Sequence, residues 1–149
     1  MPRTARIAIV ASQFHQEIAR ALVMGAVEAL SRSGISRRQI RLLWVPGAFE
    51  LPMVAARLAR NRPRPDAIIA LAAIIRGQTP QYAVLSNAVA QGLSQVAVTT
   101  GVPVTCGVIV ATTLRQATAR AGGAMGNRGA EAAAAAVSVL RLFNAFPRR

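Results

Sequence analysis

Ala67-Ile-Ile-Ala-Leu-Ala-Ala-Ile-Ile75, followed at once by Arg76-Gly-Gln-Thr-Pro80, is the stretch that decides the fold of this chain. An unbroken apolar run rich in β-branched residues is typical of a strand buried on both faces of a parallel sheet. Thr79 and Pro80 suit a helix opening, with a hydroxyl residue as N-cap and a proline at the first helical position. The stretch therefore predicts a buried strand, a tight glycine turn and then a helix from Thr79.

The turn between this strand and helix is suited to an anionic ligand. The first N–H groups of a helix have no partner within the helix, so they are free to bind a phosphate or carboxylate. Arg76 adds a fixed positive charge beside them. We therefore expect the chain to handle an anionic small molecule at Thr79. Taken alone, the stretch is also compatible with a turn that only connects the two elements, because every α/β protein has several.

Strands and helices alternate along the rest of the chain. Apolar segments predict strands at residues 6–12, 39–45, 66–75 and 104–110. Helical periodicity and capping residues predict helices at 16–33, 49–60, 79–100, 113–120 and 130–143, with the glycine-rich segment 121–129 before the last of them. This order predicts one domain over residues 1–149, a three-layer αβα sandwich around a four-stranded parallel sheet.

Composition limits the classes of protein to which the chain can belong. The hydrophobic fraction of 53% is high, yet no apolar stretch reaches the length of a membrane span, so we expect self-association and no membrane. The N-terminus lacks the apolar segment of a signal peptide, which favours a cytoplasmic protein. The single cysteine, Cys106, allows no intrachain disulfide, and one cysteine with one histidine cannot assemble a typical zinc site, so no metal is expected. No cofactor is expected.

The net charge of +13 raises the question of nucleic-acid binding. All 18 basic residues are arginines, and the chain has only five acidic residues. A basic surface attracts phosphate backbones, but these arginines are scattered and aromatic residues make up only 4% of the chain, which leaves little for base stacking. Specific nucleic-acid binding is therefore not expected, and a general arginine and alanine bias remains the alternative explanation of the charge.

Residues with binding or catalytic chemistry follow the predicted strands, at the edge where ligands bind in parallel sheets. Phe14 could stack its ring on a planar heterocycle, and His15 could donate or accept a proton near neutral pH. The alternative is that Phe14 is only a hydrophobic staple of the helix and His15 only a solvated histidine. Glu50 is suited to sugar hydroxyls, or is a first-turn acid only. Arg120 and Arg128 flank the glycine segment and are suited to a phosphate, or are solvated. No GxGxxG or Walker-type motif supports a nucleotide site.

Together these motifs resemble the lumazine synthase family, the 6,7-dimethyl-8-ribityllumazine synthases. The resemblance is collinear over about residues 7–142. It is carried by four segments: Trp44-Val-Pro-Gly-Ala-Phe-Glu50, Ala73-Ile-Ile-Arg-Gly-Gln-Thr79, Thr100-Gly-Val-Pro-Val104 and Arg120-Ala-Gly-Gly-Ala-Met-Gly-Asn-Arg-Gly129.

The resemblance implies a fold, an assembly and a reaction. The fold is flavodoxin-like, and the subunits form pentamers or sixty-subunit cages, with each active site between two neighbouring subunits. The reaction condenses 5-amino-6-ribitylaminouracil with 3,4-dihydroxy-2-butanone 4-phosphate and releases phosphate, in riboflavin biosynthesis. The expected partners are therefore these two small molecules and further copies of the chain.

The resemblance also implies the roles of site residues. Residues that hold the pyrimidine ring and the ribityl chain are Phe14, Gly47, Ala48, Phe49, Glu50, Ile74 and Ile75. Residues that cradle the phosphate are Gly77, Gln78 and Thr79. The neighbouring subunit contributes Cys106, Arg120 and Arg128, of which Arg120 pairs with the departing phosphate.

The chain departs from the family pattern at the catalytic position. Gln81 stands where the family usually carries a proton-transferring histidine, and glutamine cannot exchange a proton near pH 7. Cys106 replaces a usual aromatic residue, while Ala124 and Arg128 replace lysines. Either His15 or the substrate phosphate itself carries the remaining proton transfer, or His15 only hydrogen-bonds the pyrimidine edge. Two functions stay open: an active synthase with a compromised or relocated acid–base group, and a weakly catalytic or noncatalytic paralogue that keeps the shell and binds ribityl ligands.

Overall fold

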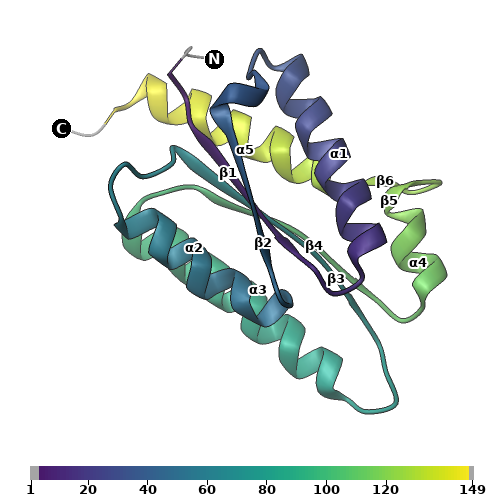
Figure 1. The fold of residues 1–149 in the computed structure, drawn as a ribbon. Coiled ribbons are helices and arrows are strands. Elements are labelled where there is room, and N and C mark those ends of the chain that lie inside the picture. Colours follow the sequence, from purple (N-terminus) through teal and green to yellow (C-terminus); the bar gives the residue numbers. More distant parts are fainter. Residues whose placement is uncertain (1–3, 148–149) are drawn as a thin grey trace.

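A parallel sheet with helices on both faces forms the body of the protein, in a computed structural model that describes residues 4–147 (Figure 1). The strand order is β2-β1-β3-β4. The strands are β1 (Ile7–Ser12), β2 (Ile40–Val45), β3 (Ala67–Ile75) and β4 (Val104–Ala111). This confirms the predicted four-stranded parallel sheet, and the order matches the first four strands of the flavodoxin-like arrangement.

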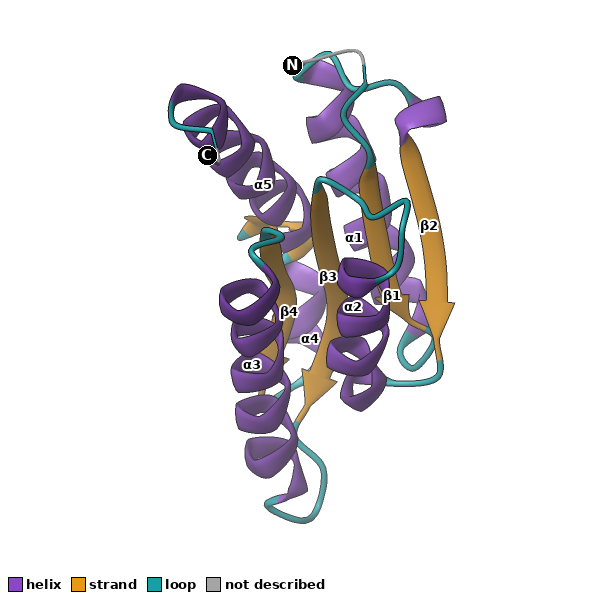
Figure 2. Ribbon diagram, turned by 90° about the vertical axis from the view of Figure 1, so that its left-hand side faces the viewer, coloured by secondary structure: helices purple, strands orange, loops and turns teal. Residues whose placement is uncertain are grey.

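Helices occupy two outer layers. They are α1 (Gln16–Arg32), α2 (Leu51–Arg60), α3 (Gln81–Thr100), α4 (Leu114–Ala119) and α5 (Arg128–Ala145), with short 3₁₀ turns η1 (Arg37–Gln39) and η2 (Ala48–Glu50). Helices α2 and α3 cover one face, while α1 and α5 cover the other (Figure 2). The predicted αβα sandwich is therefore confirmed. None of the helices within residues 4–147 combines the length and the apolar character needed to cross a bilayer.

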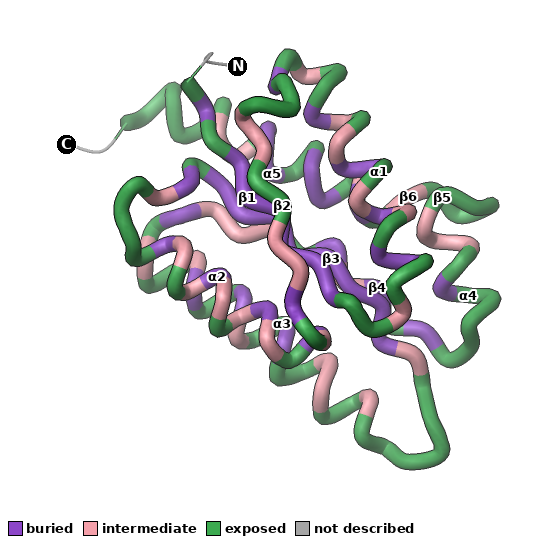
Figure 3. The backbone as a smooth tube through the Cα atoms, viewed as in Figure 1, coloured by how far each residue is buried: buried purple, intermediate pink, exposed green. Residues whose placement is uncertain are grey.

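The two central strands form the core. Every residue of β1 is buried, and so is every residue of β3 except the last (Figure 3). Alternate residues of β1 face the two helical layers: Ile7 and Ile9 pack in the cluster with α1 and α5, and Ala8 and Val10 in the cluster with α2 and α3. A strand covered on both faces needs no polar alternation, which explains the continuous apolar run of β3.

The structure corrects the predicted start of α3. This helix begins at Gln81, with Pro80 as its N-cap, so Thr79 is not the capping residue. The Thr79 hydroxyl only accepts a long hydrogen bond, 3.4 Å, from the Gln81 N–H. The reason lies in the backbone of Pro80, whose φ of −72° is helical but whose ψ of 9° is not, so the helical conformation begins one residue later.

The glycine-rich segment before α5 is also more ordered than the sequence indicates. It forms an antiparallel hairpin of β5 (Ala121–Gly123) and β6 (Gly126–Asn127). Helix α5 then starts at Arg128 instead of residue 130, because the Asn127 side chain accepts a hydrogen bond from the Ala130 N–H at 3.0 Å and caps the helix. The hairpin thus leads directly into the last helix.

Candidate active site at the carboxyl edge of the sheet

The carboxyl ends of the strands bring the predicted site loops to one edge. The Gln13 N–H donates to the Val45 carbonyl at 2.7 Å, and the Arg76 N–H donates to the Ala111 carbonyl at 2.9 Å. These bonds continue the pairing of β1 with β2 and of β3 with β4 by one residue. The loops that follow the four strands therefore leave the sheet along a common line, as parallel topology predicts.

The turn after β1 presents Phe14 and His15. The buried Ser12 hydroxyl accepts from the Phe14 N–H at 3.1 Å and holds this turn. The Phe14 side chain is 67% exposed, so it does not make the packing contact that a helix staple requires. The Phe14 and His15 rings lie edge to face, with centroids 4.6 Å apart. An exposed aromatic ring beside an imidazole is available to a planar ligand.

His15 has a strained backbone. Its φ of 55° places it in the left-handed region, and it is the only non-glycine residue with positive φ within residues 4–147. It is also the N-cap of α1, without a side-chain capping bond. Such a conformation costs about 1–3 kcal/mol and is found preferentially at functional sites. Sequence patterns gave no indication of this strain.

The turn after β2 carries Gly47, Ala48, Phe49 and Glu50. Ala48 is buried and anchors η2, whereas the Phe49 side chain is 65% exposed. A Cβ at Gly47 would lie 3.3 Å from the Glu50 carboxylate oxygen Oε1, so this carboxylate folds back over Gly47. Among the described residues, no hydrogen bond or ion pair engages the Glu50 side chain. Its oxygens are available to accept hydrogen bonds from hydroxyl groups.

The turn after β3 contains the predicted phosphate cradle. Ile74 is buried and Ile75 half-buried at the end of the strand, while the following residues are exposed: Gly77, Gln78 and Thr79. Gln81 is exposed in the first turn of α3. This helix extends past the strand ends, so its N-terminus lies at the extremity of the molecule (Figures 1 and 2). The turn and the helix N-terminus are thus open to an incoming group.

Arg120 and Arg128 are brought together by the hairpin. The Arg128 N–H donates to the Arg120 carbonyl at 2.9 Å. The Arg120 guanidinium donates from Nη1 to the Gln116 carbonyl at 3.0 Å, and the Arg128 guanidinium pairs with the Glu131 carboxylate at 2.8 Å. Figures 1 and 2 place the hairpin beside α1 and α4, at a distance from the turn after β3. Within one chain, the arginine pair and the predicted cradle are therefore not assembled into one site.

Cys106 is exposed on β4, an edge strand of the sheet. It lies apart from the strand-end loops, because it is the third residue of that strand. Four hollows of the surface also lie elsewhere: two run along β2, one lies at the amino ends of β1 and β2, and one lies beside the end of α5. None of these four is lined by residues of the strand-end loops.

Comparisons with known proteins identify the family of this chain. A family model described as 6,7-dimethyl-8-ribityllumazine synthase matches residues 4–144. The chain is similar to the 6,7-dimethyl-8-ribityllumazine synthase of Leuconostoc mesenteroides, with 45% identity over 141 residues, 95% of this chain and 88% of the relative. It is 43% identical to the protein of that name from Thermus thermophilus over 143 residues, 96% of this chain and 90% of the relative.

A third relative comes from a different source. The chain is 48% identical to the 6,7-dimethyl-8-ribityllumazine synthase of Gemmatimonas aurantiaca over 139 residues. The alignment covers 93% of this chain and 84% of the relative. The family model and these relatives extend over both the strand-end loops and the arginine hairpin. The chain therefore belongs to the 6,7-dimethyl-8-ribityllumazine synthase family.

Proposed function

We propose that this protein is a 6,7-dimethyl-8-ribityllumazine synthase, which joins 5-amino-6-ribitylaminouracil to 3,4-dihydroxy-2-butanone 4-phosphate in riboflavin biosynthesis. The observation that carries the proposal is the family match over residues 4–144. The open loops at the carboxyl edge of the sheet support it, because they present an aromatic ring, an unpaired carboxylate and a helix N-terminus together. The noncatalytic alternative is not favoured, since the relatives carry the name of the synthase.

The strand-end loops of β1 and β2 bind the aminouracil substrate in this proposal. The exposed Phe14 ring stacks on the pyrimidine. The Glu50 carboxylate accepts hydrogen bonds from ribityl hydroxyls, since no protein group in the described part of the chain occupies its oxygens. Backbone groups at Ile74 and Ile75 meet the edge of the ring.

The phosphate of the second substrate is bound by two subunits together. Backbone N–H groups of residues 77–79 and the N-terminus of α3 come from one subunit. Arg120 and Arg128 come from its neighbour, since the fold holds them away from the cradle of their own chain. The Arg128–Glu131 ion pair is exposed and therefore weak, so a phosphate can replace the carboxylate.

The chemistry then proceeds in three steps. The aromatic amine attacks the ketone carbonyl, and loss of water leaves an imine. Elimination expels inorganic phosphate, whose negative charge is already paired with the arginines. The enol left by this elimination tautomerises to a carbonyl at the carbon that bore the 3-hydroxyl group. The ribityl-bearing nitrogen attacks that carbonyl and closes the second ring with loss of another water. Holding both substrates in reacting geometry removes much of the barrier, because it replaces a bimolecular encounter.

Proton transfer in these steps needs a group other than Gln81, which has no proton to exchange near neutral pH. His15 stands beside the stacking ring and is the only histidine of the chain. We assign the surviving proton transfer to His15 together with the substrate phosphate. Turnover is expected to be slower than in family members that carry the usual histidine.

A product assay tests the function. Purified protein incubated with both substrates should form 6,7-dimethyl-8-ribityllumazine, measured by its absorbance and by mass, and should release one phosphate for each product. Reactions without protein measure the uncatalysed background. Product formation no faster than this background would contradict the proposed function.

The proposed site also predicts the state of association. The layer of α2 and α3 leaves large apolar side chains in solvent, at Met53, Val84 and Val98. Together with a site that needs a neighbour, these predict a pentamer or a multiple of five subunits, with interfaces of the size found in obligate assemblies. Sedimentation equilibrium at micromolar concentration should give such a mass, and a monomer under these conditions would rule out the shared site.

A further inference from the structure

Asn127, between the hairpin and α5, bridges the first and the last helix of the fold. Its side-chain Nδ2 donates to the Ala21 carbonyl of α1 at 3.1 Å. Its Oδ1 accepts from the Ala130 N–H in the first turn of α5 at 3.0 Å. One half-buried amide therefore uses its donor on α1 and its acceptor on α5. The residues that it joins, 21 and 127, are far apart in the sequence.

Two glycines make room for this bridge. A Cβ at Gly25 would collide with the Asn127 amide group, and a Cβ at Gly129 would collide with the Leu22 backbone. The start of α5 thus lies directly on the backbone of α1, with no side chain between them. Because such close contact leaves little room for adjustment, it fixes the end of the hairpin against a buried part of α1, where Leu22 has no exposed surface.

The same junction carries both arginines of the proposed phosphate site. Asn127 pairs with Ala121 in the hairpin, and each of these residues is a direct neighbour of one arginine in sequence. The Arg128 N–H donates to the Arg120 carbonyl at 2.9 Å, which ties the two arginine backbones together. Asn127 is therefore the polar contact that connects this arginine pair to the helix beneath it.

We propose that Asn127 is a positioning residue for the phosphate-binding pair Arg120 and Arg128. It touches neither substrate and acts by fixing the backbone positions from which the two arginine side chains extend. The inference rests on the proposed function, since the roles of the two arginines do. A small misplacement of a binding group is costly because charge-assisted hydrogen bonds depend on geometry.

Asn127→Ser separates positioning from simple helix capping. Serine caps a helix about as well as asparagine, so the bond to Ala130 is kept. Its side chain is too short to reach the Ala21 carbonyl, so the bridge to α1 is lost. We expect the KM for 3,4-dihydroxy-2-butanone 4-phosphate to rise about tenfold, while the KM for 5-amino-6-ribitylaminouracil stays within about twofold. Gly25→Ala, which displaces the amide from the other side, should have the same pattern.

Thr105→Val is the matched control. The Thr105 hydroxyl donates to the Ala132 carbonyl at 2.8 Å, so this variant removes a different hydrogen bond that holds α5. It should lower thermal stability as much as Asn127→Ser does and leave both KM values within about twofold. An increase in the KM for the phosphorylated substrate in Thr105→Val equal to that in Asn127→Ser would overturn the positioning role.

Titration calorimetry with inorganic phosphate tests the role of Asn127 by binding affinity, without relying on enzyme turnover. The assembled wild-type protein should bind phosphate, and Asn127→Ser should bind it about tenfold more weakly. Equal phosphate affinity in the two proteins would overturn the inference, whether or not the protein forms lumazine. Weaker binding in the variant would support it even if the product assay failed, so the two failures are distinguishable.

Discussion

Replacing Arg120 with alanine is expected to raise the KM for 3,4-dihydroxy-2-butanone 4-phosphate by about a hundredfold. The loss of charge-assisted hydrogen bonds, each worth about 1.5–3 kcal/mol, accounts for an effect of this size. The KM for 5-amino-6-ribitylaminouracil should change less than about threefold, because that substrate carries no phosphate. Steady-state kinetics with each substrate varied in turn measures both values. Equal losses for the two substrates would contradict the assignment.

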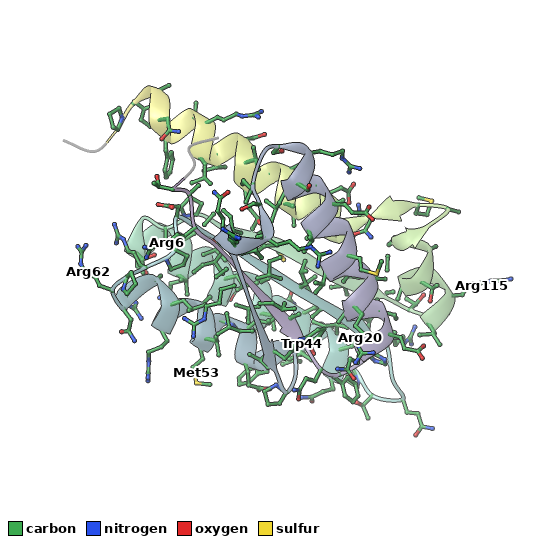
Figure 4. The ribbon with its side chains drawn as sticks, turned by 45° about the horizontal axis from the view of Figure 1, so that its top comes forward. Arg6, Arg20, Trp44, Met53, Arg62 and Arg115 are labelled. Carbon is green, nitrogen blue, oxygen red and sulfur yellow. The ribbon has the colours of Figure 1, made fainter. Side chains whose placement is uncertain are left out.

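Arg115→Ala is the matched control for this variant. Arg115 lies on the short helix α4, whose C-cap is Arg120, and its side chain points away from the molecule (Figure 4). The control removes the same charge five residues away, so it separates local phosphate binding from the general attraction of a protein with a net charge of +13. Its KM for the phosphorylated substrate should stay within about twofold of wild type at physiological salt.

A mixing experiment tests whether Arg120 acts on a neighbour. Subunits carrying Arg120→Ala are reassembled with subunits carrying Glu50→Ala. The first variant impairs the half of the site that a subunit gives to its neighbour, and the second impairs the half at its own strand-end loops. With random mixing in equal amounts, about one quarter of the sites receive two intact halves, because each half is intact in half of the subunits. Recovery of activity toward that level supports a shared site. No recovery in mixed assemblies would place both residues in a site within one chain.

Exchanging the proton-transfer groups should change kcat. Gln81→His is expected to raise kcat about tenfold or more, since acid–base catalysis contributes about 10²–10⁴ in a typical enzyme. His15→Asn should lower kcat and alter its pH profile, because asparagine cannot accept and release a proton. The double variant should recover part of the loss. Asparagine is the appropriate replacement, because it tolerates the left-handed backbone of residue 15, where φ is 55°.

The contrary outcome for His15 is equally clear. If His15→Asn changes only the KM for 5-amino-6-ribitylaminouracil, with flat pH profiles in both proteins, His15 is a binding residue for the pyrimidine edge. Catalysis would then rest on positioning of the substrates and on the departing phosphate. Pre-steady-state measurement of a single turnover separates these chemical steps from product release.

The sequence predicts the sheet well because its central strands are buried on both faces. An apolar run such as residues 67–75 has few alternatives to a buried strand once turn residues bound it. Helix starts are predicted less well. In sequence, Thr79 and Pro80 suit the N-cap and the first helical position. They suit equally well the two positions that precede the first helical residue, and only the backbone shows that Pro80 is the N-cap. Asn127 is an equally good cap, but the surrounding glycines favour a loop.

Some features of the candidate site can be predicted from the sequence and others cannot. Parallel topology alone places Phe14, Glu50 and residues 77–79 at one edge, so these follow from strand order. The left-handed backbone of His15 and the pairing of Arg128 with Glu131 do not, because they depend on contacts that no local pattern specifies. The sequence also does not indicate that Asn127 reaches α1, since that contact joins residues from opposite ends of the chain.

The packing of α5 on α1 bears on how the polypeptide folds during synthesis. Strand β1 is synthesised before its partner β3, and α1 is synthesised before α5, which covers part of it. The part of the α1 surface that packs on α5 stays uncovered until α5 has been synthesised. Domains generally fold as units during translation, and exposed apolar surface makes incomplete chains prone to aggregate. The core on this face of the sheet is therefore complete only after α5 has been synthesised.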